Sequence, residues 1–400
     1  MLTQRENSIE LGTDLNDVLV NVSEDNDNSI RNSLLPTTTT PWSKRKKLAC
    51  CCCSMPPLFC LAFFVAFIFI AYIPISNPIP TPDWALGKYK TDETIIEIGG
   101  FHKKSGSQTA WAMFPITEAG DESSPTQFPL LSYSHGDGGG GFMLHWAFGH
   151  MLHFVASHGF VVVAHRSCFW PWDCGPDFQW RDQARVIAWG AGENIEAATG
   201  EELRVLKMID RNKAAGALGQ STGGRTSIQA AAAASEGSEG EDFKYLGAGC
   251  IGASVAIHPD PCIGHHDGWL HVSCDRAGDV TQVPYAVFTS LGDDTEPQGS
   301  ALANYNAASS QNRAFVSLAG ISHIKGTGPI WGLYAAAYFH VFLNNATAVD
   351  DYYFNIVYDG FCAAGKEKDF INDAGVLCEV TEFTRSLELR TDNRLLPSWC

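Results

Sequence analysis

Short apolar runs alternate with helix-forming stretches through most of the chain after residue 94. The apolar runs are predicted strands, at residues 94–98, 110–114, 129–134, 160–164, 214–219, 248–256, 285–291 and 315–318. The stretches between and after them are predicted helices, at residues 142–157, 201–211, 226–234 and 329–343. The 160–164 run shows no alternation of polar and apolar residues, which is typical of a strand covered on both faces. Repeated strand–helix units predict an α/β fold with a mostly parallel central sheet and helices on both faces.

The first 82 residues follow a different pattern. Residues 1–55 are polar, without a periodic apolar face, and are predicted to be a disordered tail that ends in the basic cluster 44–47 and the cysteines 50–53. Residues 56–75 are dense in Phe, Ile, Leu and Ala, carry no charge and are long enough to cross a bilayer. A proline-rich linker, 76–82, leads to one predicted domain at 83–400.

The charge next to the apolar segment predicts its orientation. Basic residues tend to stay in the cytosol, so we expect a single-pass type II membrane protein with a cytosolic N-terminus and a lumenal or extracellular domain. The cysteines 50–53 are then candidates for palmitoylation, although an incidental cysteine patch is an equal alternative. A cleaved signal peptide is disfavoured because the charged region before the apolar segment would be unusually long.

Eight cysteines follow the apolar segment: Cys168, Cys174, Cys250, Cys262, Cys274, Cys362, Cys378 and Cys400. An even number in a lumenal domain predicts disulfides; the local pairs Cys168/Cys174 and Cys362/Cys378 are the first guesses, and the connectivity stays open. The Asn345 sequon would be glycosylated on this topology, and the Asn21 sequon would not.

The overall charge excludes one class of partner. The formal net charge is −17, whereas nucleic-acid binding requires clustered Lys and Arg that neutralise phosphates. We therefore expect no nucleic-acid partner, and polyanionic substrates are disfavoured.

Candidate chemistry centres on Ser221. It lies in the sequence Gly219-Gln220-Ser221-Thr222-Gly223, which fits G-x-S-x-G and stands between a predicted strand and a predicted helix. In that context the pattern predicts a nucleophile elbow, because the turn is too sharp for side chains two residues before and after the serine. A plain strand–helix turn of small residues is the alternative.

A serine nucleophile requires an imidazole to take its proton and a carboxylate to hold that imidazole. In this topology both should follow the serine, each just after a strand. His323 follows the 315–318 strand and is the predicted base. Asp294 follows the 285–291 strand and is the predicted acid, with its neighbour Asp293 as the alternative and Asp260 as the next choice.

A second group of histidines raises the question of a metal. His258, His265, His266 and His271 follow the 248–256 strand, with Asp260 and Asp267 between them. Their spacing matches no recognisable ligand pattern, so a polar loop near the site is the better interpretation. We expect no metal and no cofactor.

Donors for a developing oxyanion and a substrate pocket complete the prediction. The backbone amides of Thr222, after the serine, and Asp137, in the glycine-rich loop after His135-Gly136, are the expected oxyanion donors. Phe169, Trp170 and Trp172 follow another strand and would line a pocket for an apolar acyl or alcohol group, although packing explains them equally well.

Together these residues resemble the α/β-hydrolase superfamily. The runs Ser132-Tyr133-Ser134-His135-Gly136 and Ser157-His158-Gly159-Phe160 resemble the branch of dienelactone-hydrolase-like, platelet-activating-factor-acetylhydrolase-like, chlorophyllase-like and polyester-hydrolase (cutinase-like) enzymes. The resemblance covers about residues 94–360 and implies that fold, esterase activity and no cofactor. Gln220 stands where many members have His, and Asp137 where the branch often has an apolar or aromatic residue.

The sequence thus predicts a membrane-anchored serine esterase that acts on a small-molecule or lipid-like ester. Two alternatives stay open. One is an inactive hydrolase-fold ectodomain that serves for binding, and the other is a thioesterase or peptidase that uses the same three residues.

Overall fold

A single sheet of nine strands organises the part of the chain that this computed structural model describes. The described residues are 86–101, 108–117, 125–136, 140, 143–166, 176–192, 195–236, 250–260, 278–293, 295–318, 323, 328–344, 352–358 and 380–386. The strands are β1 Lys90–Glu97, β2 Thr109–Ile116, β3 Leu130–Ser134, β4 Val161–His165, β5 Ala215–Gln220, β6 Ile251–Ile257, β7 Tyr285–Ser290, β8 Arg313–Leu318 and β9 Val380–Ser386. Their order across the sheet is β1-β2-β4-β3-β5-β6-β7-β8-β9.

The middle of the sheet is parallel and its ends are antiparallel. Strands β4, β3, β5, β6, β7 and β8 pair in parallel, whereas β1–β2, β2–β4 and β8–β9 pair antiparallel. Every residue of β3, β4, β5, β6 and β7 is buried, as expected for strands covered on both faces. The edge strand β1 instead mixes exposed, half-buried and buried positions.

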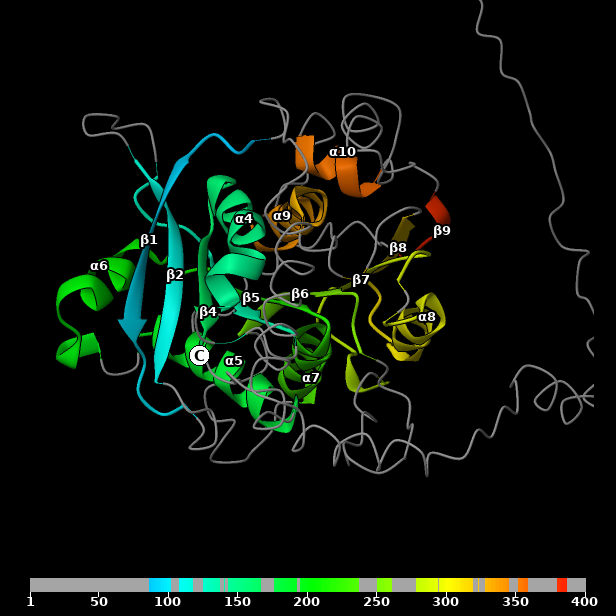
Figure 1. Ribbon diagram of the computed structural model, residues 1–400, viewed down its shortest axis with the longest axis horizontal. Coiled ribbons are helices and arrows are strands. Elements are labelled where there is room, and N and C mark those ends of the chain that lie inside the picture. The colour runs from blue at the N-terminus through cyan, green and yellow to red at the C-terminus, as the bar shows by residue number, and fades with distance from the viewer. Residues whose placement is uncertain are drawn as a thin grey trace, which may run out of the picture. The chain divides into compact units, whose positions relative to one another are not determined.

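Helices cover both faces of the sheet (Figure 1). The helices are α4 Met143–Ser157, α5 Pro176–Gly190, α6 Gly200–Met208, α7 Thr222–Glu236, α8 Gln298–Ala307, α9 Pro329–Leu343 and α10 Tyr352–Tyr358, with a single 3-10 turn at Ile195–Ala197. One core packs α4, α9 and α10 against the sheet, and the other packs α5, α6, α7 and α8 against the opposite face. The predicted α/β class, with a mostly parallel sheet between two helical layers, is confirmed.

Local sequence explains the two helices closest to the site. Helix α7 carries five consecutive alanines, residues 230–234, and all are buried; these small side chains let the helix pack closely on β5 and β6. Helix α9 starts with Pro329 at its first turn, where a missing N–H costs nothing, and is apolar along most of its length. Such a helix must be covered on several sides, and α4 and α10 pack against it.

Most predicted elements are present with boundary shifts of a few residues. Helix α9 has the predicted bounds, whereas α7 begins at Thr222, four residues before the prediction, because the helix starts directly after the serine. Three α-helices and one strand were not predicted: α5, α8, α10 and β9. Helix α5 escaped prediction because the polar residues Gln179, Asp182 and Gln183 are buried together with its apolar residues, which interrupts the apolar stripe along the sequence.

The predicted membrane segment lies outside the described residues. So do the cytosolic tail, the linker, the Asn345 sequon and seven of the eight cysteines. Within the described residues, none of the helices has the length and apolar character needed to cross a bilayer. Cys250, the remaining cysteine, is disulfide-bonded.

Candidate active site

Ser221 occupies a strained turn between β5 and α7. Its φ is +58°, in the left-handed region that residues other than glycine rarely adopt, at a cost of about 1–3 kcal/mol. The turn is held by Ser221 N–H donating to the carbonyl of Ile257 at 2.9 Å. The residue is 8% exposed, so the hydroxyl lies at the edge of the core. Strain at this position is typical of a functional site.

The two glycines around Ser221 are required sterically. A Cβ on Gly219 would lie 2.0 Å from the carbonyl oxygen of Gly223, and a Cβ on Gly223 would lie 2.0 Å from the carbonyl oxygen of Ser134. Real Cβ atoms do not approach backbone this closely, so neither position admits a side chain. The prediction that a sharp turn excludes side chains on both sides of the serine is confirmed.

The loop after β3 lies directly against this turn. A Cβ on Gly136 would come within 2.9 Å of both the Ser221 Cβ and the Gln220 side-chain oxygen. Thr222 is the first residue of α7, so its backbone N–H precedes the helical hydrogen bonds. Asp137, the other predicted oxyanion donor, lies outside the described residues, but its neighbour Gly136 is at the serine.

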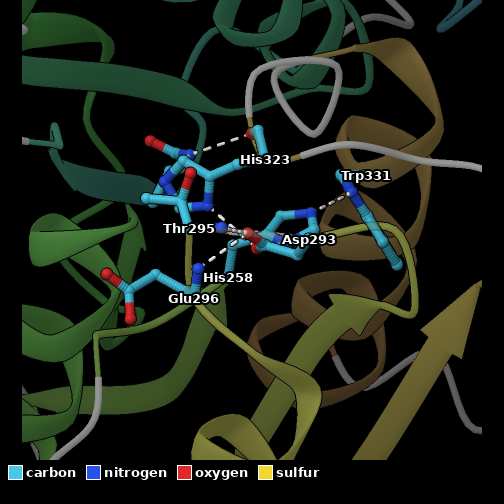
Figure 2. A network of polar contacts seen from close by, with 7 residues as sticks. His258, Asp293, Thr295, Glu296, His323 and Trp331 are labelled. Atoms are coloured by element: carbon cyan, nitrogen blue, oxygen red, sulfur yellow. Dashed lines mark hydrogen bonds and ion pairs between the residues drawn. The ribbon is translucent and has the colours of Figure 1, made fainter. Parts of the chain in front are cut away.

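His323 contacts a carboxylate, and that carboxylate belongs to Asp293. The Nδ1–H of His323 donates to Oδ2 of Asp293 at 2.8 Å (Figure 2). The sequence favoured Asp294 with Asp293 as the alternative, and in the structure the carboxylate that contacts His323 is that of Asp293. Asp294 itself lies outside the described residues. The two aspartates are neighbours in the sequence just after β7, and sequence position alone does not tell which one faces the histidine.

The second oxygen of Asp293 is held by the backbone. Its Oδ1 accepts hydrogen bonds from the N–H groups of Thr295 at 2.9 Å and Glu296 at 2.8 Å. Aspartate commonly binds backbone two or three residues ahead in this way, and the contact forms the turn after β7. Asp293 is 5% exposed, so this turn fixes the carboxylate where water has little access.

A second histidine shares the carboxylate. His258, just after β6, donates from Nδ1 to Oδ2 of Asp293 at 2.6 Å. Burial raises the pKa of Asp293, but the hydrogen bonds from His258, His323 and Glu296 outweigh it and hold this pKa well below its usual range. Asp293 is therefore a carboxylate at neutral pH.

His258 itself is completely buried. Burial lowers its pKa, and the adjacent Asp293 carboxylate offsets part of that effect. Trp331, from α9, donates its indole N–H to Nε2 of His258 at 3.1 Å. Figure 2 shows Trp331 and Asp293 on opposite sides of the His258 ring.

The three groups His258, Asp293 and His323 are close enough to hold a metal ion, with ligand atoms within 4.8 Å of one another. The hydrogen bonds of His258, however, disfavour metal binding. An indole N–H only donates, so it occupies the Nε2 lone pair of His258 and leaves the proton on Nδ1. That proton points at Asp293, and the nitrogen then offers no lone pair to a metal. His265, His266 and His271 lie outside the described residues.

Gln220 connects His323 with the serine turn. The Gln220 side-chain nitrogen lies 3.4 Å from Nε2 of His323 and 3.3 Å from its carbonyl oxygen. Since Nδ1 of His323 donates to Asp293, its Nε2 carries the lone pair and faces the residue directly before Ser221. The structure therefore brings the predicted base to the predicted nucleophile turn.

Asp260, the next choice for the predicted acid, contacts the start of α7 instead. Its Oδ2 accepts a hydrogen bond from the Thr222 hydroxyl at 2.7 Å, and its backbone N–H donates to the carbonyl of Ser221 at 3.3 Å. It thus supports the start of α7, while Asp293 is the carboxylate that contacts His323.

Sequence analysis missed Gln183, which braces the strands under the turn. Its side-chain nitrogen lies 3.0 Å from the carbonyl oxygens of Ser132 and Leu218 and 3.1 Å from the Ser227 hydroxyl. These contacts join β3, β5 and α7 from the buried face of α5. No signal pointed to Gln183, because α5 was not predicted. His258 had a signal, its place after a strand, but the sequence did not connect it with Asp293.

The predicted pocket residues Phe169, Trp170 and Trp172 lie outside the described residues. The arrangement that the structure describes is thus a strained serine, an imidazole that contacts the residue before it, and a buried carboxylate. A scan of the sequence against protein-family models gives no match, and a search of curated proteins gives none either.

Proposed function

We propose that this chain is a serine hydrolase of the α/β-hydrolase fold that cleaves carboxylic esters. The observation that carries the proposal is the position of His323, which donates to Asp293 on one side and faces the serine turn through Gln220 on the other. The sheet order, with the serine after the central strand β5 and the acid and base after β7 and β8, supports it. A plain strand–helix turn has no need of these partners.

In the proposed reaction, Nε2 of His323 exchanges its contact with Gln220 for the Ser221 hydroxyl and takes its proton. The serine oxygen attacks the ester carbonyl, and the backbone N–H groups of Thr222 and Asp137 stabilise the oxyanion. The imidazolium then protonates the leaving alcohol. Water, activated by the same imidazole, releases the acid from the acyl-enzyme and restores Ser221.

The test of this proposal is covalent labelling of the full-length protein with a fluorophosphonate probe. Wild type should be labelled and should cleave short-chain p-nitrophenyl esters, whereas Ser221→Ala should lose both properties. Ser309→Ala changes an exposed serine and is the matched control. Labelling that persists in Ser221→Ala removes this serine from the proposed role. An unlabelled, inactive wild type favours an ectodomain that only binds.

The proposed enzyme is anchored in a membrane by residues 56–75, with its domain on the lumenal or extracellular side. The disulfide at Cys250 supports an oxidising compartment. On this topology glycosidase treatment should lower the mass of the wild-type protein, and Asn345→Gln should abolish the shift. Asn21→Gln should leave it unchanged; the reverse pattern would contradict the orientation.

A further inference from the structure

His258 is the one completely buried side chain in the acid–base group that the proposed reaction does not use. It lies after β6 with φ +45°, a strained conformation for a residue other than glycine. Its backbone N–H donates to the carbonyl of Phe288 at 2.7 Å. Both ring nitrogens also have partners, Asp293 and Trp331. A strained, buried and fully hydrogen-bonded imidazole beside a reactive group calls for a specific explanation.

The surroundings fix the position of the proton on this ring. The Trp331 indole donates to Nε2 and is itself held by stacking on Phe288, with ring centroids 5.4 Å apart and planes 7° from parallel. Nε2 therefore acts as the acceptor, and Nδ1 carries the proton and donates it to Asp293. A protonated ring would place an N–H against the indole N–H, so the packing favours the neutral form.

We propose that His258 is a positioning residue that holds the Asp293 carboxylate in line with His323. This inference rests on the proposed hydrolase function. His258 donates to the same oxygen, Oδ2, that His323 contacts, while the backbone holds Oδ1. The carboxylate thus has four donors and cannot rotate without losing one. The titratable groups that act on His258 are Asp293 and His323.

The shared oxygen has a second consequence. Each donor withdraws electron density from the carboxylate, so the hydrogen bond from His258 weakens the hold of Asp293 on a protonated His323. Removal of this donor should therefore loosen the carboxylate and also stabilise the imidazolium form of His323. A residue that only fills space would not change the protonation of His323.

The experiment compares full-length His258→Leu, His258→Asn and Trp331→Phe with wild type. His258→Leu removes the donor and should lower kcat by about tenfold or more with little change in KM, as for a lost hydrogen bond to a charged group. The acid limb of its kcat/KM profile should move to higher pH. His258→Asn retains an N–H donor at the position of Nδ1 and should recover part of kcat. Trp331→Phe keeps the stacking and should lie between these variants.

A spectroscopic measurement keeps the test valid where activity is absent or His258→Leu folds poorly. Imidazole protons bonded to a carboxylate resonate at low field in proton NMR. Wild type should show two such signals, His258→Asn should lose one, and His323→Ala should lose the other. Trp331→Phe, a second folded variant, should keep both signals.

The outcomes distinguish the positioning role of His258 from the proposed hydrolase function. Wild-type kcat and an unmoved acid limb in His258→Leu, or a single low-field signal that His258→Asn retains, would overturn the role of His258. A wild type that does not react with the fluorophosphonate overturns the hydrolase function only. The NMR signals then still decide whether His258 holds Asp293.

Discussion

Two of the histidine–carboxylate pairs in the described part of the chain have nearly the same length but very different surroundings. At the sheet centre, His258 lies 2.6 Å from Asp293, and both side chains are 0% exposed. At the edge, His153 of α4 lies 2.7 Å from Glu93 of β1, and their side chains are 30% and 37% exposed. Distance alone would rank the pairs as equals. Burial separates them, because water screens the edge pair and scarcely reaches the central one.

The second partner of each ring adds to the difference. The other nitrogen of His153 lies 2.9 Å from the Thr91 hydroxyl, which can donate or accept and so suits a neutral or a charged ring. The other nitrogen of His258 faces the Trp331 indole, which only donates and so suits the neutral ring. The edge pair is thus an adaptable surface contact, whereas the central pair has one protonation state and one geometry.

The largest expected effect comes from breaking the central pair. Asp293→Asn removes the charge that four donors face, and kcat should fall by on the order of 10⁴, as when the carboxylate of a serine–histidine–aspartate site is neutralised. Glu93→Gln is the matched change at the edge; it should leave kcat unchanged and alter stability by less than about 1 kcal/mol. Ester hydrolysis and denaturant unfolding measure the two effects.

Asp294→Asn sharpens this prediction, because it neutralises the adjacent carboxylate that the sequence favoured. A loss of kcat in Asp294→Asn as large as that in Asp293→Asn would contradict the choice of Asp293.

Two glycines, one at the buried serine turn and one with open space around it, allow the same comparison for packing. Gly223→Ala places a methyl group 2.0 Å from the carbonyl oxygen of Ser134, whereas a methyl group on Gly99 would meet nothing within 4 Å. We expect Gly223→Ala to lower the free energy of unfolding by about 1–3 kcal/mol or more, since backbone must move, and Gly99→Ala to change it by less than about 0.5 kcal/mol. Equal stability of the two variants in urea would show that the serine turn is less tightly packed than the structure describes.

Mild acidification of the wild-type protein should also lower its stability. Burial lowers the pKa of His258, and burial together with the nearby His135 lowers the pKa of His165 well below its usual range. The unfolded chain then binds more protons than the folded one below about pH 6.5, so stability falls with pH by up to about 1.4 kcal/mol per unit per group.

Thermal melting between pH 7 and 5 measures this slope. His258→Asn and His165→Gln should each flatten it, because neither replacement binds a proton in this range. An unchanged slope in both variants would show that other groups cause the acid loss. Asp293 adds a separate loss of stability below about pH 4, because this carboxylate takes up a proton in the unfolded chain at a higher pH than in the folded protein.

Much of the fold was predictable because its signals are local. Apolar runs and helical periodicity identified eight of the nine described strands and the two helices that flank the site most closely, α7 and α9. Helix α5 was not predicted, because polar side chains such as Gln179 and Gln183 are buried among its apolar ones and blur the helical pattern of the sequence. Of the predicted site, Ser221 and His323 lie as expected, while the residues of the predicted pocket are outside the described part.

The sequence by itself determined the serine turn and the strand ends that carry the proposed acid and the proposed base. Those features depend on steric limits within a few residues and on the alternation of strands and helices. Only the tertiary structure decided that Asp293 faces His323. It also brought His258 to Asp293, 35 residues away in the sequence, and Trp331 to His258, 73 residues away. The physical reason is that hydrogen-bond partners and burial arise when strand ends meet across a sheet, and no local pattern records which side chains will face one another there.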